Sequence, residues 1–202
     1  MIVTGDSFRF IVNEQLEAIG AKNSEILIEP SGKNTAPAIL AAALRAIETN
    51  PNAILLVAPA DHVVPDEAAF RAAVRRGLAA VAEGRLVTFG ITPTRPETGY
   101  GYLELSERPQ ADGAPIPLRR FVEKPGLAEA ARMIADGSYL WNAGIFLFSA
   151  RDLITAFERC APTMVGPVAA AVEGIRSDLA FQRLDPAAWE KVPAESIDYA
   201  VM

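Results

Sequence analysis

The chain has 202 residues, half of them hydrophobic and 22% charged, which is typical of a globular protein and excludes an intrinsically disordered one. Its 19 basic and 25 acidic side chains give a net charge of −6, which disfavours non-specific binding to a nucleic acid backbone. The single cysteine and single histidine exclude an internal disulfide and a zinc site built on several Cys or His ligands.

The two ends of the sequence and its longest apolar runs indicate where in the cell the protein is expected. No apolar run approaches the roughly 18 residues of a membrane span, and residues 1–6 lack the basic flank and apolar stretch of a signal peptide. We therefore expect a cytoplasmic protein with no membrane partner. The chain opens directly in a strand-like run at residues 2–4 and has no polar tail before Met202, which predicts truncation at both ends.

The first half of the chain alternates short apolar runs with amphipathic helices. Residues 26–28 are expected to form a strand, and a helix follows from near Thr35 until the turn-forming residues 50–52. Residues 54–57 form a continuous apolar run, which predicts a strand buried on both faces. Such strands are usually parallel to their neighbours.

A second helix is expected after Pro65, and residues 86–89 form the next expected strand. This alternation predicts right-handed β-α-β units with helices on both faces of a sheet, that is, an α/β protein. Further strands are expected at residues 100–105, 116–123 and 141–148, a short helix at residues 127–135, and mainly helices from Arg151 onward. Because no repeat or low-complexity linker divides the chain, we predict a single domain over residues 1–202.

Asp61 follows the apolar run at residues 54–57 and is therefore expected at the carboxyl end of a central strand, where open α/β sheets bind ligands. A carboxylate there suits Mg²⁺ shared with substrate phosphates, since Mg²⁺ takes one or two carboxylates and completes its shell with water and phosphate oxygen. Alternatively, Asp61 caps the helix after Pro65 or closes a turn. No nucleophile or second histidine supports catalysis by His62, so a structural role is favoured for it.

Residues 29–35 lie between a strand and a helix N-terminus, a position suited to an anion or to the edge of a nucleobase. Gly32 and Lys33 resemble the end of a Walker A loop. However, Leu27 stands where that motif needs glycine, and Asn34 follows the lysine in place of Ser or Thr, so the Walker A interpretation fails. The Asn34 amide can still offer both a donor and an acceptor. An ordinary capped loop is the alternative.

Three further segments place glycine or polar side chains near strand ends. In residues 97–102, two glycines let a ligand approach the backbone, or they form a tight turn beside two core tyrosines. Glu123 and Lys124 point to opposite faces of a strand and need not pair, so they can serve sugar hydroxyls and a phosphate, or simply be solvated. Asn142 lies in an apolar strand and needs partners, either backbone groups or ligand hydroxyls.

The order of these segments is more specific than any one of them. The segments read EPSGKNTAPA at residues 29–38, PADH at 59–62, PTRPETGYGY at 93–102, FVEKP at 121–125 and WNAGIF at 141–146. This series resembles the bacterial mannose-1-phosphate guanylyltransferases, and SIDYAVM at residues 196–202 also looks like a segment of that family. The resemblance implies a nucleotidyltransferase that forms GDP-mannose and pyrophosphate from GTP and mannose 1-phosphate, with Mg²⁺ as cofactor.

The resemblance also implies a doubly wound, mostly parallel, Rossmann-like sheet and gives roles to particular residues. Asp61 is implied as the metal ligand and, together with Lys124, as a catalytic residue. The nucleotide side would comprise Glu29, Pro30, Asn34, Thr35, Pro59 and Ala60. The sugar-phosphate side would comprise Gly99, Tyr100, Gly101, Glu123, Lys124, Asn142 and Gly144.

The sequence departs from the family pattern at both ends. Members of the family begin with a strand and a Gly-rich triphosphate loop, and they continue past Met202 to a second metal-binding aspartate. We therefore expect the 202 residues alone to make little GDP-mannose. Loss of the first strand would also expose an apolar sheet edge and favour a homo-oligomer.

Two other functions are alternatives to the nucleotidyltransferase. The first is a catalytically silent relative that binds sugar phosphate or nucleotide, or an inactive fragment of the enzyme. The second is a metal-dependent glycosyltransferase. It is disfavoured because such enzymes usually carry Asp-x-Asp at the metal, whereas Asp61 is followed by His62 and Val63.

Overall fold

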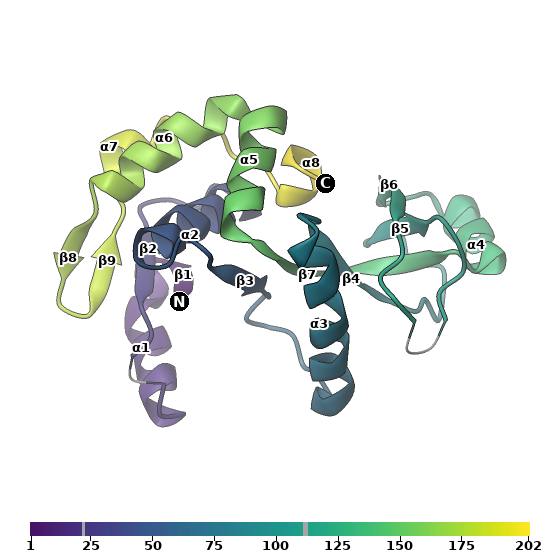
Figure 1. The fold of residues 1–202 in the computed structure, drawn as a ribbon. Coiled ribbons are helices and arrows are strands. Elements are labelled where there is room, and N and C mark those ends of the chain that lie inside the picture. Colours follow the sequence, from purple (N-terminus) through teal and green to yellow (C-terminus); the bar gives the residue numbers. More distant parts are fainter. Residues whose placement is uncertain (22, 111–112) are drawn as a thin grey trace. The chain divides into compact units, whose positions relative to one another are not determined.

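The structure is a computed structural model that describes residues 1–21, 23–110 and 113–202 (Figure 1). These residues divide into two compact units. Unit 1 comprises Met1–Ala53 and Leu153–Met202, and unit 2 comprises Ile54–Asp152. Among the described residues, no helix is both long and apolar enough to cross a membrane. The single domain expected over residues 1–202 stays a prediction.

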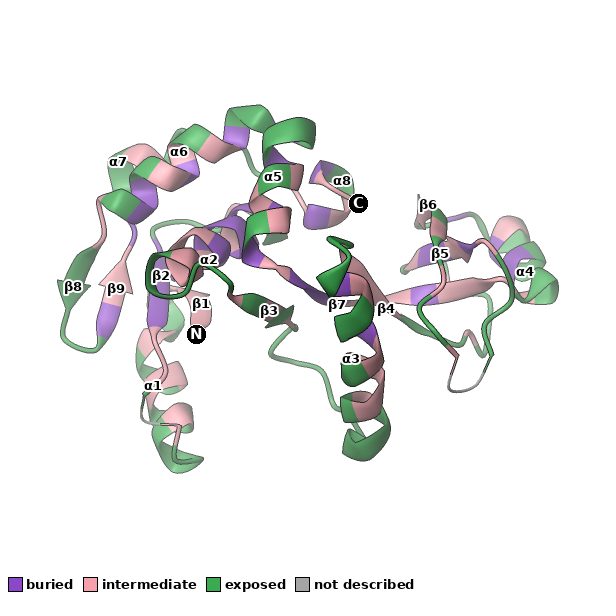
Figure 2. Cartoon of the chain, in the orientation of Figure 1, coloured by how far each residue is buried: buried purple, intermediate pink, exposed green. Residues whose placement is uncertain are grey.

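Unit 1 contains a four-stranded sheet in the order β1-β2-β9-β8. Its strands are β1 (Ile2–Gly5), β2 (Ile26–Glu29), β8 (Arg176–Asp178) and β9 (Phe181–Arg183). β2 pairs in parallel with both β1 and β9, and all four of its residues are buried (Figure 2). The strands expected near residues 2–4 and 26–28 are therefore confirmed. The β8–β9 hairpin was not expected from the sequence.

Unit 1 also contains helices. They are α1 (Arg9–Ala18) after the 3-10 turn η1 (Asp6–Phe8), α2 (Thr35–Thr49), most of α5 (Ala150–Cys160), α6 (Pro162–Glu173), α7 (Pro186–Trp189) and α8 (Ile197–Ala200). α2 begins at Thr35 as expected, because the Asn34 side chain caps it, and its apolar face buries Ile39 and Leu40. α2 packs against α6 and α8.

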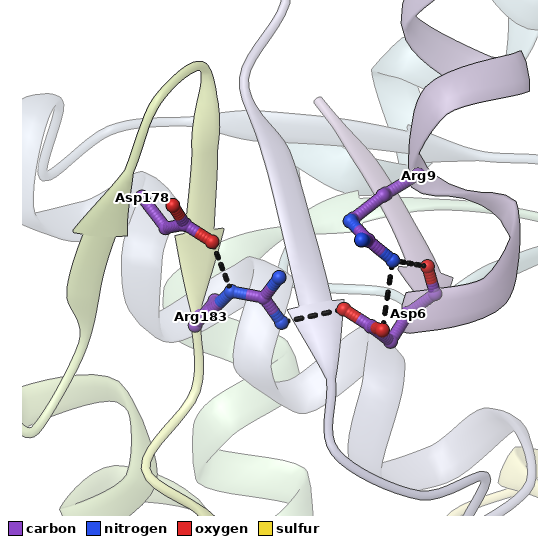
Figure 3. A network of polar contacts seen from close by, with 4 residues as sticks. All are labelled: Asp6, Arg9, Asp178 and Arg183. Carbon is purple, nitrogen blue, oxygen red and sulfur yellow. Dashed lines mark hydrogen bonds and ion pairs between the residues drawn. The ribbon is translucent and has the colours of Figure 1, made fainter.

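A row of ion pairs joins the end of β1 to the β8–β9 hairpin (Figure 3). Arg183 donates to Asp178 at 2.7 Å and to Asp6 at 2.5 Å, and Asp6 also accepts from Arg9 at 2.8 Å. All four side chains are partly exposed, and such pairs contribute little to stability. Their clearer effect is to tie the hairpin to the end of β1 across the intervening strand β2.

Unit 2 is organised around the long strand β7 (Tyr139–Ser149). The other strands are β3 (Ile54–Val57), β4 (Val87–Ile91), β5 (Gly101–Leu105) and β6 (Leu118–Glu123), and the helices are α3 (Glu67–Ala82) and α4 (Leu127–Asp136). β3, β4 and β5 each pair with β7, and β6 pairs with β5. The helices and strands expected here are confirmed, with ends shifted by one or two residues.

The α/β class is confirmed, but the expectation of a mostly parallel sheet is corrected in unit 2, where all four described pairings are antiparallel. β3 and β4 run in the same direction, yet β7 lies between them, so that Leu147 pairs with Leu56 of β3 and with Val87 of β4. β2 and β3 belong to different sheets.

β3 was expected to be buried on both faces, and this was wrong. Ile54 is 51% exposed and Leu56 is 44% exposed (Figure 2). Ile54 and Leu56 alternate with the half-buried Leu55 and Val57, so the two exposed residues share one face of β3 and only the other face is partly covered. A continuous apolar run identifies a strand but does not say whether both of its faces are covered.

Candidate active site

The residues of unit 1 that the family resemblance predicts for the nucleotide side lie at the carboxyl end of β2. Glu29 is the last residue of that strand and is only 9% exposed. Burial raises its pKa to about 7, although the backbone N–H of Lys33 donates a hydrogen bond to its carboxylate and opposes the shift. A carboxyl group so placed carries a proton through much of the acidic range and can accept N–H groups once it is ionised.

The loop after Glu29 is exposed at Pro30 and Asn34, yet its geometry is closely defined. Asn34 adopts a positive φ of 70°, and its side-chain oxygen accepts the backbone N–H of Thr35 at 2.8 Å. The Thr35 hydroxyl in turn accepts the backbone N–H of Ile197 at 2.9 Å. The loop is thus capped at the start of α2, as the structural alternative held. Its exposed surface still suits a nucleobase.

Asp61 lies in an exposed turn after β3, together with Pro59 and Ala60. It does not cap the following helix, because Asp66 is the N-cap of α3 and its side chain accepts the backbone N–H of Ala69 at 2.8 Å. The Asp61 carboxylate makes no hydrogen bond or ion pair with the described residues. Of the structural alternatives for Asp61, capping is therefore excluded, and a turn residue with an available carboxylate remains.

Within unit 2, the Asp61 loop approaches β7 at Gly144. Gly144 has a φ of 65°, and a Cβ added there would lie 3.7 Å from Cγ of Pro59. Two residues earlier, the side-chain oxygen of Asn142 accepts the Thr88 hydroxyl and the backbone N–H of Gly144, both at 3.2 Å. Asn142 therefore has protein partners, as the structural alternative held, and it fixes the backbone beside Pro59.

Most of the residues that the family resemblance predicts for the sugar side meet where β5 begins and β6 ends. Gly101 pairs with Glu123 across the ladder, and the backbone N–H of Lys124 donates to the Tyr100 carbonyl at 3.3 Å. Lys124 adopts a φ of 44°, so it leaves the extended geometry and its ammonium lies 3.2 Å from the Glu123 carboxylate. The two side chains therefore pair, although neighbours on a regular strand point apart.

The segment leading into β5 is held by Glu97, a residue to which the sequence motifs assign no role. Its carboxylate accepts the backbone N–H groups of Thr98 and Gly99, and the Gly99 hydrogen bond lowers the pKa of Glu97. The backbone N–H and carbonyl of Glu97 both bond the buried Tyr102 hydroxyl, at 3.0 and 2.9 Å. Of the two tyrosines in the motif, Tyr102 is core and Tyr100 is 44% exposed.

Gly101 provides a direct test of this geometry. A Cβ at Gly101 would lie 2.4 Å from Cζ of Phe121 and 2.9 Å from a carboxylate oxygen of Glu123. We expect Gly101→Ala to displace Glu123 and to lower the free energy of unfolding by about 1–3 kcal/mol, the usual cost of overpacking. Urea unfolding measures this. Gly5→Ala, at an extended position (φ −76°) with open space around the new Cβ, is the control and should be neutral or stabilising. Equal stability of the two variants would contradict the packing.

The structure thus brings the predicted residues together in three groups. The groups are Glu29, Pro30, Asn34 and Thr35 in unit 1, then Pro59, Asn142 and Gly144 in unit 2, and finally Gly99, Tyr100, Gly101, Glu123 and Lys124 in unit 2. The second and third groups lie on neighbouring strands, because Tyr102 and Trp141, next to Gly101 and Asn142, pair across β5 and β7. Ala60 and Asp61 lie in the loop of the second group without a bond to it.

Comparison with known proteins identifies the class. Residues 1–192 match the family model described as nucleotidyl transferase. The match spans elements of both units. The chain therefore belongs to the nucleotidyl transferase family, a family of enzymes.

The relatives narrow this class. The xanthan biosynthesis protein XanB of Xanthomonas campestris pv. campestris (strain B100) is 47% identical over the whole chain, and the mannose-1-phosphate guanylyltransferase of Escherichia coli (strain K12) is 42% identical. A crystal structure of mannose-6-phosphate isomerase from Helicobacter pylori superposes with a TM-score of 0.86 at 30% identity, over all of this chain and 77% of that one. The resemblance to mannose-1-phosphate guanylyltransferases is confirmed. The chain spans 42–43% of the length of the two curated relatives.

Proposed function

We propose that this chain supplies the base-side and sugar-side residues for the nucleotidyl-transfer reaction of a mannose-1-phosphate guanylyltransferase, which joins GMP from GTP to mannose 1-phosphate and releases pyrophosphate. The observation that carries the proposal is the arrangement of Glu123 and Lys124 beside Gly101. A carboxylate that accepts sugar hydroxyls and a cation that attracts phosphate stand next to a residue without a side chain. The named relatives support the same chemistry.

The residues present suit an in-line phosphoryl transfer. A phosphate oxygen of mannose 1-phosphate forms a bond to the α-phosphorus of GTP, and the bond from that phosphorus to the bridging oxygen of the β-phosphate breaks, so that pyrophosphate leaves. The attacking oxygen is already anionic, so no strong general base is required. Positioning and charge neutralisation carry most of the catalysis in such reactions. Lys124 would neutralise the sugar phosphate, Glu123 would orient the sugar, and residues 29–35 would hold the nucleotide.

Asp61 is the residue that would hold Mg²⁺. Its exposed carboxylate has no partner among the described residues, which also contain no group of three or more His, Cys, Asp or Glu able to form a complete metal cage. One carboxylate fits a Mg²⁺ ion shared with substrate phosphates, which needs only one or two from the protein. When bound, the ion would neutralise negative charge on the phosphate oxygens.

The function can be tested with the chain as it stands. We expect calorimetry to detect binding of mannose 1-phosphate and of GTP, and we expect the 202 residues alone to release little pyrophosphate even with both ligands and Mg²⁺. Turnover comparable with that of a full-length relative assayed in parallel would show that the 202 residues hold every group that the reaction needs. Binding of neither would contradict the proposal.

Lys124→Met tests the sugar-phosphate side. Removing the cation beside Glu123 should weaken binding of mannose 1-phosphate at least roughly tenfold, because hydrogen bonds to charged groups contribute about 1.5–3 kcal/mol. GTP binding should change much less. Lys191→Met removes the same charge from an exposed position in unit 1 and is the control. Similar losses of sugar-phosphate affinity in both variants would show that only net charge matters.

A further inference from the structure

The loop that follows β2 in unit 1 is held by a segment more than 150 residues later in the chain. The Trp189 indole N–H donates to the Ser31 carbonyl at 2.8 Å. The backbone N–H of Glu195 donates to the Lys33 carbonyl at 3.1 Å, and the Lys33 ammonium donates to the Glu190 carbonyl at 3.3 Å. Residues 189–197 thus fix a loop that is itself largely exposed.

The contacts continue into the first turn of α2. The Thr35 hydroxyl accepts the backbone N–H of Ile197, and the backbone N–H of Ala36 donates to the Glu195 carbonyl at 3.1 Å. Since the first N–H groups of a helix lack intrahelical acceptors, a carbonyl supplied from outside completes the start of α2. The loop is therefore anchored at both ends and in the middle.

The anchoring segment is itself rigidly placed. Trp189 is fully buried and Ile197 is 1% exposed, so neither can move without disturbing the core of unit 1. The Asp185 side chain caps α7 by accepting the backbone N–H of Ala188 at 2.9 Å, and the Asp185 carbonyl accepts the backbone N–H of Trp189 at 3.0 Å. Trp189 therefore presents its indole N–H from a fixed direction.

We propose that Trp189 is a positioning residue for nucleotide binding: its indole N–H fixes the Ser31 carbonyl and thereby the backbone of residues 30–34, whose exposed groups bind the base of a purine nucleoside triphosphate. This inference rests on the proposed function, which places the nucleotide at this loop. Trp189 touches no substrate. It raises affinity by restricting the loop to its binding conformation before the ligand arrives.

The test removes the N–H and keeps the shape of the ring. Replacing the Trp189 indole by benzothiophene, with an encoded unnatural amino acid, substitutes sulfur for N–H in a side chain of nearly the same volume. We expect GTP to bind roughly tenfold more weakly, near the upper end of what one neutral hydrogen bond contributes, and mannose 1-phosphate to bind as before. Calorimetry measures both. Trp189→Phe, which also leaves a cavity, should show the same selective loss of GTP affinity along with lower thermal stability.

Trp141 offers a matched control in unit 2. Its indole N–H is buried without a hydrogen-bond partner among the described residues, so replacing that N–H by sulfur should leave GTP affinity unchanged.

Trp141 and Trp189 are the two tryptophans of the sequence, so 5-fluorotryptophan labelling gives two assignable ¹⁹F signals. GTP should shift the Trp189 signal, which a merely structural tryptophan would not show.

The outcomes separate the two claims. If the unmodified chain binds GTP and the benzothiophene variant binds it equally well, the role of Trp189 is overturned while the proposed function stands. If the variant loses affinity for GTP and mannose 1-phosphate alike, Trp189 supports the fold in general, and the positioning role is overturned. If the unmodified chain binds no nucleotide, both claims fall.

Discussion

In a full-length version of the enzyme, Asp61→Asn should lower the rate of pyrophosphate release from GTP and mannose 1-phosphate at least roughly 100-fold. Loss of one charge-stabilising group in an active site usually acts on this scale. The substitution removes the charge that would hold Mg²⁺ and keeps the shape of the side chain. Because the Asp61 carboxylate has no partner among the described residues, its loss should break no bond in the fold. Pyrophosphate release at increasing Mg²⁺ concentrations should show a higher requirement for the ion.

Asp66→Asn is a close control for this prediction. Asp66 lies in the same loop and carries the same charge, but its carboxylate caps α3. Asparagine caps helices nearly as well as aspartate, so this variant should fold normally and turn over at close to the original rate. If both variants lose activity equally, the loop's overall charge matters and Asp61 has no special role. An unchanged rate and Mg²⁺ requirement in Asp61→Asn would remove it from the metal site.

Glu29→Gln should make the protein more stable at neutral pH. The carboxyl group has a pKa of about 7 in the folded chain against an ordinary value of 4.5, because burial disfavours its charge. Between about pH 4.5 and 7 the unfolded chain loses this proton while the folded chain keeps it, so stability falls as pH rises. Above pH 7 the accumulated cost is on the order of 3 kcal/mol.

Glutamine cannot ionise, so the difference in stability between Glu29→Gln and the original chain should grow from pH 4.5 to 7 and then level off. Urea unfolding at several pH values measures the difference. Glu14→Gln makes the same change on the exposed surface of α1 and should give a nearly constant small difference. A constant difference for Glu29→Gln as well would contradict the raised pKa.

Binding of the nucleotide should be coupled to release of the proton that the Glu29 carboxyl group carries. A base that donates N–H groups to Glu29 favours the ionised form, so GTP binding near pH 6 should release protons. Calorimetry in buffers of different ionisation enthalpy detects that release. Its absence would place the base away from Glu29, while leaving the stability prediction intact.

The sequence predicts the local elements of this fold well and their partners poorly. The periodic apolar residues of α2 and the run at β3 identify a helix and a strand without any knowledge of tertiary contacts. The antiparallel partner of β3 lies about ninety residues later, in β7, and no local pattern encodes that pairing. The β8–β9 hairpin was missed for a related reason. Its strands have three residues each, too few for a period to emerge, and Arg183 gains its place through long-range contacts.

For the candidate site, too, the sequence identifies residues better than it identifies their contacts. The motif residues were visible in the sequence, but their partners were not. Pairing of Glu123 with Lys124 depends on the positive φ of Lys124, which a non-glycine residue rarely adopts. The role of Trp189 depends on a hydrogen bond to Ser31, which lies 158 positions earlier in the chain. For Asp61, only the observation that Asp66 caps α3 removed the capping alternative.

Unit 1 is built from two separate stretches of chain, and this dictates when it can fold during synthesis. Ile28 leaves the ribosome long before its ladder partner Arg183 exists. At about 5–20 residues per second, the delay is on the order of ten seconds. Throughout that time the apolar strand β2 has only β1 beside it. Unit 2, by contrast, is continuous and is complete once β7 has emerged. We expect unit 2 to fold first on the nascent chain, while the half-made unit 1 depends on chaperones to keep β2 from pairing with other chains.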